Sequence, residues 1–460
     1  MRVGLLLVAG LVLFLLTRPR SPRMTGSRFA SLTQLRTLRA GRSASGRLPL
    51  GSAAVAGWNA IPLALSTPAG ESLLVLGPTR SGKTTSLIIP ALLSWPGPVV
   101  AASVKDDLVR STAGWRAQVG SVGILAPGGG GTVHYDPVAR AGSWSEATRV
   151  ASALALGTAG SQANGEMAFW GQLAAKLLAG FLLAAHRAEG DVGLVGRWLE
   201  ERAIDEPLGW LAEGCDGAAR RSLVASWSRE DRQLGSVLAT AETVIDPLLA
   251  EASGVALDPE RLLAEDGTLY LCAPAQEQRR FASLFAATTD EVLRAAFLRA
   301  GQEGGRLRSP LLVVLDEAAA IAPLADLDVL AATGAGHGIT LITCFQDLAQ
   351  VTARWGERTG TLVNNHRTRV ILGGLADPTA AELVVGLAGV RRDRMGGDSP
   401  GVLERPLVAA HELRQMPLRS GLVISGSVPV ARLRLRPWWQ HRGLAERGRR
   451  PFDVTTSEYA

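Results

Sequence analysis

Short apolar runs recur along this chain, and longer stretches with helical periodicity separate most of them. Runs of this length, several of them rich in valine and isoleucine, are typical of buried strands. Strands that alternate with helices predict an α/β fold with a mainly parallel sheet. The runs that we interpret as strands cover residues 72–76, 98–104, 122–127, 268–274, 310–317, 338–345 and 368–374, and residues 422–436 predict a terminal hairpin.

The pattern changes between about residues 143 and 255. Helical periods dominate there and strand patterns vanish, so we predict an inserted all-α domain. Residues 167–188 are apolar enough to resemble a membrane span. Gln172 and Lys176 interrupt this stretch, which favours a buried helix.

An uninterrupted apolar run from Val3 to Leu16 begins the chain. It is short beside the roughly 17–25 residues that usually span a bilayer. We interpret residues 1–17 as a single-pass transmembrane anchor, with a cleaved secretory signal as the alternative. One arginine precedes the run and eight follow it before residue 50, so the positive-inside rule predicts a cytoplasmic body at the inner membrane.

These boundaries divide the rest of the chain into five segments. They are a basic juxtamembrane linker (18–55), the first part of the α/β domain (56–142), the all-α insert (143–255), the second part of the α/β domain (256–437) and a polar tail (438–460).

The formal net charge of +6 arises at the N-terminus. The first 50 residues hold nine arginines and no acidic residue, so the other 410 residues carry 39 basic and 42 acidic groups. The charge distribution therefore does not support a protein that coats DNA with a generally basic surface. The three cysteines lie far apart without a C-x-x-C pair, which excludes a recognisable zinc site or disulfide framework.

Residues 77–84, Gly-Pro-Thr-Arg-Ser-Gly-Lys-Thr, match the P-loop pattern G-x-x-x-x-G-K-[ST] at every position. The motif follows an apolar strand and opens a helix, as a phosphate-binding loop requires. Lys83 is expected to reach the β- and γ-phosphates of ATP and to act in catalysis, and Thr84 to coordinate Mg²⁺. The residues expected to bind the nucleotide are Gly77, Thr79, Arg80, Ser81, Gly82, Lys83, Thr84 and Thr85.

Residues 311–317, LLVVLDE, predict a buried strand whose end presents two acidic residues. Asp316 is expected to hold the Mg²⁺ shell and Glu317 to polarise the attacking water, although the pair could instead cap the next helix. Gln346 ends the following strand. It is expected to sense the γ-phosphate or position water, with a strand-end hydrogen bond as the alternative.

Two other polar clusters are weaker candidates. Lys105, Asp106 and Asp107 end a predicted strand, where they either face a ligand or cap the next helix. His134, Tyr135 and Asp136 have no metal-ligand companion in the sequence and are expected to be structural.

From about residue 60 to 430 the chain resembles the conjugative coupling proteins, the TraG/TraD-type, FtsK/HerA-like P-loop ATPases of type IV secretion. The resemblance rests on the order of GPTRSGKTTSLIIPALL, VVAASVKDDL, GILAP, MAFW, LLVVLDE, GITLITCFQDLAQ and TLVNNHRTRVILGG. It implies a membrane-anchored homo-hexamer with a RecA-like motor domain that uses ATP and Mg²⁺. It also implies partners: a transferred DNA strand, presumed single, a relaxase or other relaxosome protein, and the proteins of the secretion channel.

Two features depart from the family. The chain shows one short apolar N-terminal run where members commonly have two membrane helices. Residues 334–338 contain no arginine, although an arginine that reaches the neighbouring subunit's ATP is common there. Either another residue, such as Arg367 or Arg369, replaces it, or hydrolysis is weak.

Two other functions stay open. One is an FtsK-like chromosome pump, which the long insert and the lack of a basic C-terminal winged helix disfavour. The other is a substrate-docking receptor that binds ATP only to assemble.

Overall fold

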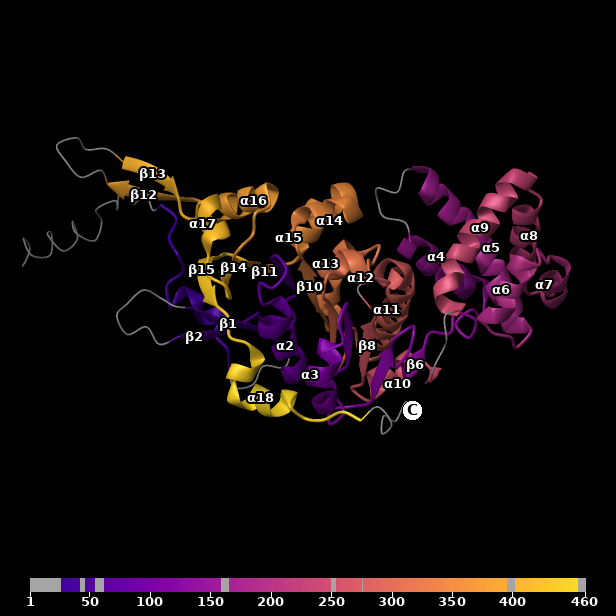
Figure 1. The fold of residues 1–460 in the computed structure, drawn as a ribbon, viewed down its shortest axis with the longest axis horizontal. Coiled ribbons are helices and arrows are strands. Elements are labelled where there is room, and N and C mark those ends of the chain that lie inside the picture. The colour runs from indigo at the N-terminus through magenta and orange to yellow at the C-terminus, as the bar shows by residue number, and fades with distance from the viewer. Residues whose placement is uncertain are drawn as a thin grey trace, which may run out of the picture.

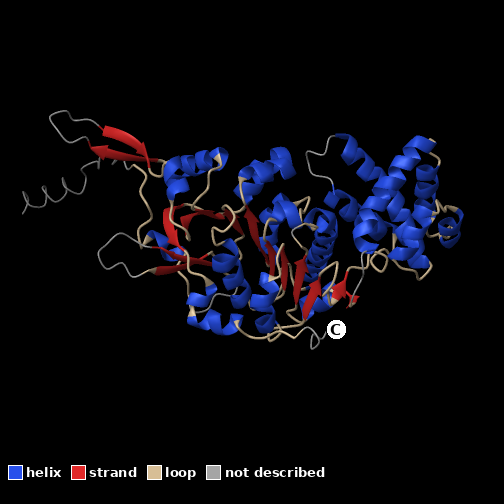
Figure 2. Ribbon diagram, in the orientation of Figure 1, coloured by secondary structure: helices blue, strands red, loops and turns tan. Residues whose placement is uncertain are grey.

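The computed structural model describes residues 26–41, 46–53, 62–158, 165–249, 254–274, 276–394 and 402–453. Within these residues, one mixed sheet of 11 strands runs through the molecule, and a group of helices lies at one end of it (Figures 1 and 2). The strand order is β2-β1-β15-β14-β11-β3-β10-β9-β4-β8-β5. The expected α/β fold with a mostly parallel sheet is confirmed.

The parallel part of the sheet runs from β11 to β5. Nearly every residue in these strands is buried, because helices cover both faces. The strands are β3 (Leu73–Leu76), β4 (Val99–Ser103), β5 (Val122–Leu125), β8 (Thr268–Cys272), β9 (Leu311–Leu315), β10 (Ile339–Phe345) and β11 (Thr368–Leu372). Each lies within a run predicted to be a strand.

The antiparallel part of the sheet contains the predicted hairpin, β14 (Ser420–Ser425) and β15 (Val428–Arg434). Next to it lie β1 (Pro49–Ala53) and β2 (Leu63–Ser66), which the sequence did not predict as strands.

The expectation of a linker over residues 18–55 is wrong for the described part of that segment. Leu35, Leu38, Leu48 and Leu50 are buried, and β1 pairs with β15. A few leucines among arginines and glycines give no clear period, and the strand partner lies almost 400 residues away (Ser52 opposite Arg434). The predicted anchor, residues 1–17, lies outside the described residues.

Two hydrophobic cores fill the two faces of the sheet. On one face, Leu73 and Val75 pack with α2 (Ile89–Ser94) and α3 (Asp107–Arg116). On the other, Leu74 and Leu76 belong to a larger core that includes α11 (Gln278–Gln302). This alternation is the two-residue period of a strand covered on both sides.

The described part of the predicted polar tail, residues 438–453, packs against the α/β domain. It forms η4 (Trp438–Gln440) and α18 (Arg442–Gly448), and α18 lies against α2 and α3 (Figure 1). Arg447 donates a 2.7 Å hydrogen bond to the Leu93 carbonyl, and its guanidinium lies 4.3 Å from the centre of the Trp115 ring. Arginine side chains that lie over the Trp115 ring thus hold the segment in place. Such contacts leave no apolar periodicity in the sequence from which they could be predicted.

The helices at the end of the sheet pack around α5. They are α4 (Trp144–Thr158), α5 (Gly165–Arg187), α6 (Val192–Glu200), α7 (Asp205–Trp210), α8 (Gly217–Trp227) and α9 (Asp231–Leu249). Phe181 of α5 lies against Trp198 and Trp227, at ring-centre distances of 5.9 and 6.2 Å. No helix among the described residues, α5 included, combines the length and apolarity needed to cross a bilayer.

The remaining elements connect these parts. They are η1 (Gln34–Thr37), η2 (Thr84–Ile88), β6 (Val133–His134), β7 (Val255–Ala256), α10 (Pro259–Ala264), α12 (Ala318–Ile321), α13 (Leu327–His337), α14 (Leu348–Trp355), η3 (Gly356–Arg358), α15 (Thr359–Asn365), α16 (Pro378–Ala388), β12 (Val390–Arg394), β13 (Val402–Pro406) and α17 (Ala410–Gln415).

Candidate functional site

Three neighbouring parallel strands carry the predicted site residues at their carboxyl ends. β10 lies between β3 and β9, with Phe345 opposite Leu76 and Thr343 opposite Leu315. The loop after β3 is the P-loop, the residues after β9 are Asp316 and Glu317, and the residue after β10 is Gln346. The topology therefore brings the three predicted motifs to one edge of the sheet.

The P-loop backbone depends on two glycines. A Cβ on Gly77 would lie 2.8 Å from the Leu372 Cβ, so only glycine fits beside β11. Gly82 has φ of +99°, a conformation that side chains disfavour. Arg80 adopts φ of +63° without being glycine. Such a conformation costs about 1 kcal/mol or more and is characteristic of functional loops.

The other predicted loop residues differ in exposure. Thr79 and Arg80 are exposed at the tip, Ser81 is buried, and Thr85 is half-buried at the start of the following helix. That helix begins as the π-helical turn η2 and continues as α2. The Ile89 amide donates to the Thr84 carbonyl, five residues before it, which is the bond of a widened turn.

Lys83 is buried beneath the loop. Its Nζ donates hydrogen bonds to the carbonyl oxygens of Gly77 and Pro78, the latter at 3.1 Å. Among the described residues, the hydrogen bonds of this buried ammonium go to backbone carbonyls of its own loop, so it is available to bind an anion there.

Thr84 and Asp316 are in direct contact. The Thr84 hydroxyl donates to Asp316 Oδ2 at 2.9 Å. Burial raises the pKa of Asp316 to about 6, while the hydrogen bond from Thr84 and the charge of Lys83 oppose the rise. A buried carboxylate beside a hydroxyl supplies the oxygen ligands that Mg²⁺ prefers, so these residues fit the predicted ion.

The part of the chain that the structure describes contains no group of three His, Cys, Asp or Glu side chains able to hold a metal ion. Mg²⁺ usually takes only one or two protein carboxylates and completes its shell with substrate phosphates and water. The site thus fits an ion that arrives with a nucleotide.

Glu317 and Gln346 also meet. Gln346 Nε2 donates to Glu317 Oε1 at 3.0 Å. Glu317 has φ of +69°, a strained conformation for a residue with a side chain, and it caps no helix through its carboxylate. Glu317 occupies the N-cap position of α12 (Ala318–Ile321), but capping does not account for its carboxylate, which makes no capping hydrogen bond.

Two further residues lie at this edge, the weaker candidate Asp107 and Arg419, which was not predicted. Asp107 is half-buried, its Oδ1 has no hydrogen-bond partner among the described residues, and its charge contributes to the raised pKa of Asp316. Arg419, before β14, packs its Cγ 3.4 Å from the position of a Cβ on Gly82. The triplet Lys105–Asp107 pointed to the first, and no sequence pattern pointed to the second.

Asp106 and the cluster His134–Asp136 make local contacts. Asp106 pairs with Arg110 at 2.6 Å on the surface, and Asp136 accepts hydrogen bonds from the amides of Val138 and Ala139. Tyr135 is buried. His134 lies in β6, which pairs with β7. The expectation that His134, Tyr135 and Asp136 are structural agrees with this placement.

The two arginines considered as inter-subunit contacts differ in exposure. Arg369 is buried, and it donates hydrogen bonds to the carbonyls of Val363 and Asn364. The Arg367 side chain is 69% exposed and lies 3.7 Å from Glu71. Of the two, Arg367 is therefore the one whose guanidinium is accessible at the surface.

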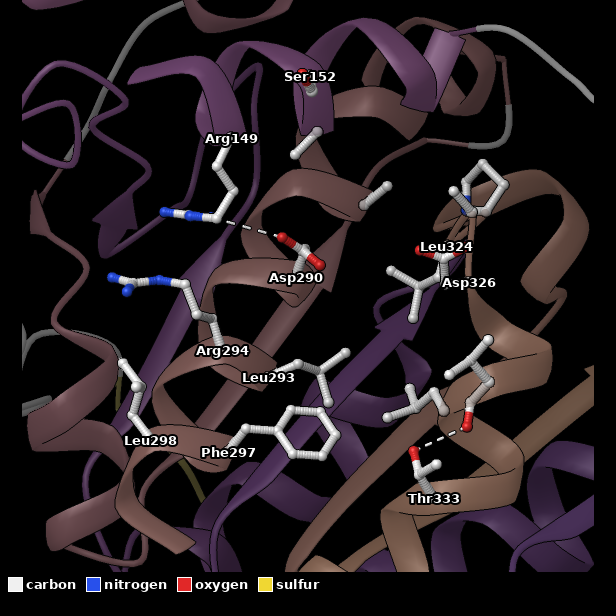
Figure 3. A pocket seen from close by; sticks show the side chains of 16 residues that line it. Arg149, Ser152, Asp290, Leu293, Arg294, Phe297, Leu298, Leu324, Asp326 and Thr333 are labelled. Carbon is white, nitrogen blue, oxygen red and sulfur yellow. Dashed lines mark hydrogen bonds and ion pairs between the residues drawn. The ribbon is translucent and has the colours of Figure 1, made fainter. Parts of the chain in front are cut away.

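A separate cavity of about 590 Å³ lies between α4, α11 and α13 (Figure 3). Leu293, Phe297 and Leu330 contribute apolar walls, and Arg149, Asp290 and Arg294 lie toward one end. The cavity is lined by none of the predicted nucleotide-binding residues.

Comparison with protein families gives two matches along the chain. Residues 51–201 match the family described as type IV secretory system conjugative DNA transfer. Residues 310–418 match the family described as the TraM recognition site of TraD and TraG. Together the two matched segments cover more than half of the chain.

Individual proteins show the same likeness. The conjugal transfer protein TraG of Escherichia coli is 28% identical over 319 residues, which are 62% of this chain and 49% of TraG. The chain thus spans about half the length of the curated relatives it matches.

Solved structures share the fold. The plasmid coupling protein TrwB in complex with the ATP analogue ADPNP has a TM-score of 0.67 and 20% identity, covering 90% of this chain and 94% of TrwB. TrwB in complex with ADP and Mg²⁺ has a TM-score of 0.61 and 18% identity, covering 86% of this chain and 96% of TrwB. The two family matches and the sequence likeness to TraG, on a fold that brings the P-loop, Asp316 and Gln346 together, show that the chain belongs to the TraG/TraD family of conjugative coupling proteins.

Proposed function

We propose that this protein is a membrane-anchored ATPase that couples ATP hydrolysis to the delivery of DNA, with a bound relaxase, into a type IV secretion channel. The observation that carries the proposal is the pair of contacts at the sheet edge. Thr84 donates to Asp316 at 2.9 Å and Gln346 donates to Glu317 at 3.0 Å, so residues from three loops form one site.

Each residue then has a role in phosphoryl transfer. When the nucleotide binds, the Lys83 ammonium replaces its hydrogen bonds to the loop carbonyls with hydrogen bonds to phosphate oxygens. The backbone amides around Gly82 donate to the same phosphates. Thr84 and Asp316 would hold Mg²⁺, which neutralises phosphate charge when bound. Glu317 accepts a proton from the attacking water, and Gln346 orients that water beside the γ-phosphate.

Nucleotide binding by relatives supports these roles. TrwB structures hold ADPNP in one case and ADP with Mg²⁺ in another. We infer that ATP and Mg²⁺ bind this chain at residues 77–85 and at Asp316. The motor would then have a RecA-like core, with α4–α9 as an inserted domain between its two parts.

The family also suggests the partners. Residues 310–418 match a TraM recognition site, so we infer contact with a relaxosome protein of the TraM kind. The match of residues 51–201 to conjugative DNA transfer supports DNA, a relaxase and channel proteins as further partners. A homo-hexameric ring and an anchor over residues 1–17 at the inner membrane complete the proposal.

A receptor that binds ATP only to assemble is the second candidate. The lack of arginine in residues 334–338 favours it, since a motor needs a cation from the neighbouring subunit. The intact pair of Glu317 and Gln346 favours hydrolysis, because both are dispensable for binding alone.

ATP turnover separates the two candidates. The full chain in detergent should release phosphate from ATP in a reaction that requires Mg²⁺. The variant Glu317→Gln keeps an oxygen for the Gln346 hydrogen bond but loses the base, so turnover should fall on the order of 100-fold while ATP still binds. Equal turnover in the variant would remove Glu317 from catalysis, and no turnover in the wild type would favour the receptor.

A further inference from the structure

Arg419 connects the P-loop to the C-terminal segment. It lies directly before β14, has φ of +61° and is half-buried. Its Cγ lies 3.4 Å from the position of a Cβ on Gly82. The arginine stem therefore packs on the second glycine of the phosphate-binding loop.

The other end of Arg419 lies over an aromatic ring. Its guanidinium carbon is 6.0 Å from the centre of the Trp439 ring, within the range of a cation–π contact. The Trp439 side chain is 43% exposed, although it is among the largest apolar groups of the chain. Two contacts thus lead from Gly82 to an exposed indole.

The Trp439 ring packs against the ring of Trp438. The two indoles are nearly perpendicular, at 85°, with ring centres 5.7 Å apart. Trp438 is in turn fixed by α18, because an atom of its ring lies 2.5 Å from the position of a Cβ on Gly448. Only glycine fits at that point, so α18 holds Trp438, and Trp438 holds Trp439 at the surface.

The position of Trp439 relative to the sheet indicates its ligand. On one side of β3 lie β10 and then β9, the strand that ends at Asp316 and Glu317. On the other side of β3 lies β11. β14 pairs with β11, with Gly421 opposite Leu372, so Arg419 lies on the side away from the acidic pair. A triphosphate whose γ-phosphate faces Glu317 must extend its nucleoside toward this opposite side.

The geometry points to Arg419 and Trp439 as the platform that binds the base of a nucleoside triphosphate. The inference rests on the proposed function, since it assigns the nucleoside end of the same site. The base stacks against the exposed indole, and the guanidinium lies between the base and the phosphates held at Gly82. Stacking on an aromatic ring tolerates different bases, so the platform adds affinity for ATP and GTP alike.

Calorimetric titration of the full chain tests this with three ligands in the presence of Mg²⁺: ATP, GTP and tripolyphosphate, which has no base. In Trp439→Ala the affinities for ATP and GTP should each fall about tenfold, and the affinity for tripolyphosphate should stay the same. Trp439→Phe retains a ring and should recover much of the loss. Trp210→Ala, which removes a similarly exposed tryptophan (48%) in α7, should bind all three ligands like the wild type.

The other outcomes contradict the inference. Unchanged ATP and GTP affinities in Trp439→Ala would show that the base lies elsewhere. Equal losses for all three ligands, tripolyphosphate included, would show that Trp439 only supports the loop. A wild type that binds neither ATP nor tripolyphosphate would overturn the proposed function itself, and a wild type that binds tripolyphosphate as tightly as ATP would overturn the base platform alone.

Discussion

Lysine is scarce in this protein, with three lysines beside 45 arginines. Lys83 is buried under the P-loop, whereas Lys176 is exposed on α5. A compact ammonium fits between loop carbonyls where a planar guanidinium does not, which explains why this position keeps lysine.

The first prediction concerns this ammonium. Lys83→Ala removes the main cation of the phosphate site, so the affinity for ATP should fall at least about 100-fold. Calorimetry on the full chain measures the change, with Lys176→Ala as the control that should bind normally. ATP binding of normal strength in Lys83→Ala would mean that the loop does not hold the phosphates.

His366 makes the free energy of unfolding depend on pH. It is fully buried, and its ring nitrogens bond to the Thr343 hydroxyl at 3.0 Å and to the Leu362 carbonyl at 2.9 Å. Burial lowers the pKa of His366 from 6.5 to about 4. The folded state therefore binds the proton less readily than the unfolded state, and the stability present above pH 6.5 is lost as the pH falls toward 4.

The second prediction follows from this difference. Between pH 7 and pH 5 the wild type should lose roughly 2 kcal/mol of unfolding free energy through His366. His366→Gln removes the titrating group, so its urea midpoint should vary less with pH than that of the wild type. Asp316 titrates in both proteins and cancels in the comparison, and His411→Gln, at an exposed position, should leave the wild-type slope unchanged. Identical slopes in wild type and His366→Gln would contradict the assignment.

At the scale of elements, a buried charge joins α4 to α11. Glu291 is fully buried and accepts hydrogen bonds from Arg149 of α4 at 2.6 Å and from Arg294 at 3.1 Å. α4 begins the helical group and α11 covers the sheet, so this cluster joins the helical group to the α/β domain. A buried carboxylate that loses one of two cations is left partly uncompensated.

The third prediction is that Arg149→Ala destabilises the protein by about 1–3 kcal/mol in urea unfolding. The control is Arg280→Ala, which breaks an exposed pair with Asp246 at 3.0 Å. Exposed pairs contribute at most about 1 kcal/mol, so the control should change stability little. Equal effects of the two substitutions would show that Glu291 does not depend on Arg149.

The sequence predicts some elements better than others, for physical reasons. β9 and β10 lie in the middle of the sheet, so both faces are apolar and the run is visible in the sequence. β1 has only Leu50 and Ala53 buried, and it pairs with β15 from the far end of the chain. α18 is held by Arg447 on Trp115, a contact between segments that no local pattern encodes.

The same distinction applies to the site. The P-loop motif at residues 77–84 follows one predicted parallel strand, and Asp316 follows another. The sequence therefore predicts that both lie at the same edge of the sheet. Arg419 approaches Gly82 through packing alone, and Asp107 is distinguished by burial that one sequence does not show.

At the scale of the whole molecule, the proposed membrane anchor consists of the first residues of the chain. The fourth prediction is that removal of residues 1–23 releases the protein into the soluble fraction with an unchanged unfolding midpoint, because the apolar run precedes every described element. Fractionation at alkaline pH measures the release. A truncated protein that stays in the membrane would assign attachment to another segment.

DNA binding is expected to arise from assembly. The chain after residue 50 carries slightly more acidic than basic groups, so one subunit offers few phosphate contacts. A ring repeats those contacts by symmetry around one strand, which raises affinity and makes it sensitive to salt. Hydrolysis that occurs between subunits should then respond to DNA.

The measurement that tests the account most directly is ATP hydrolysis by the full chain with and without single-stranded and duplex DNA at low salt. The account predicts that DNA raises the rate several-fold, that added salt removes the increase, and that Lys83→Ala shows no hydrolysis with or without DNA. A rate that is the same with and without either form of DNA would contradict the coupling of hydrolysis to DNA transfer.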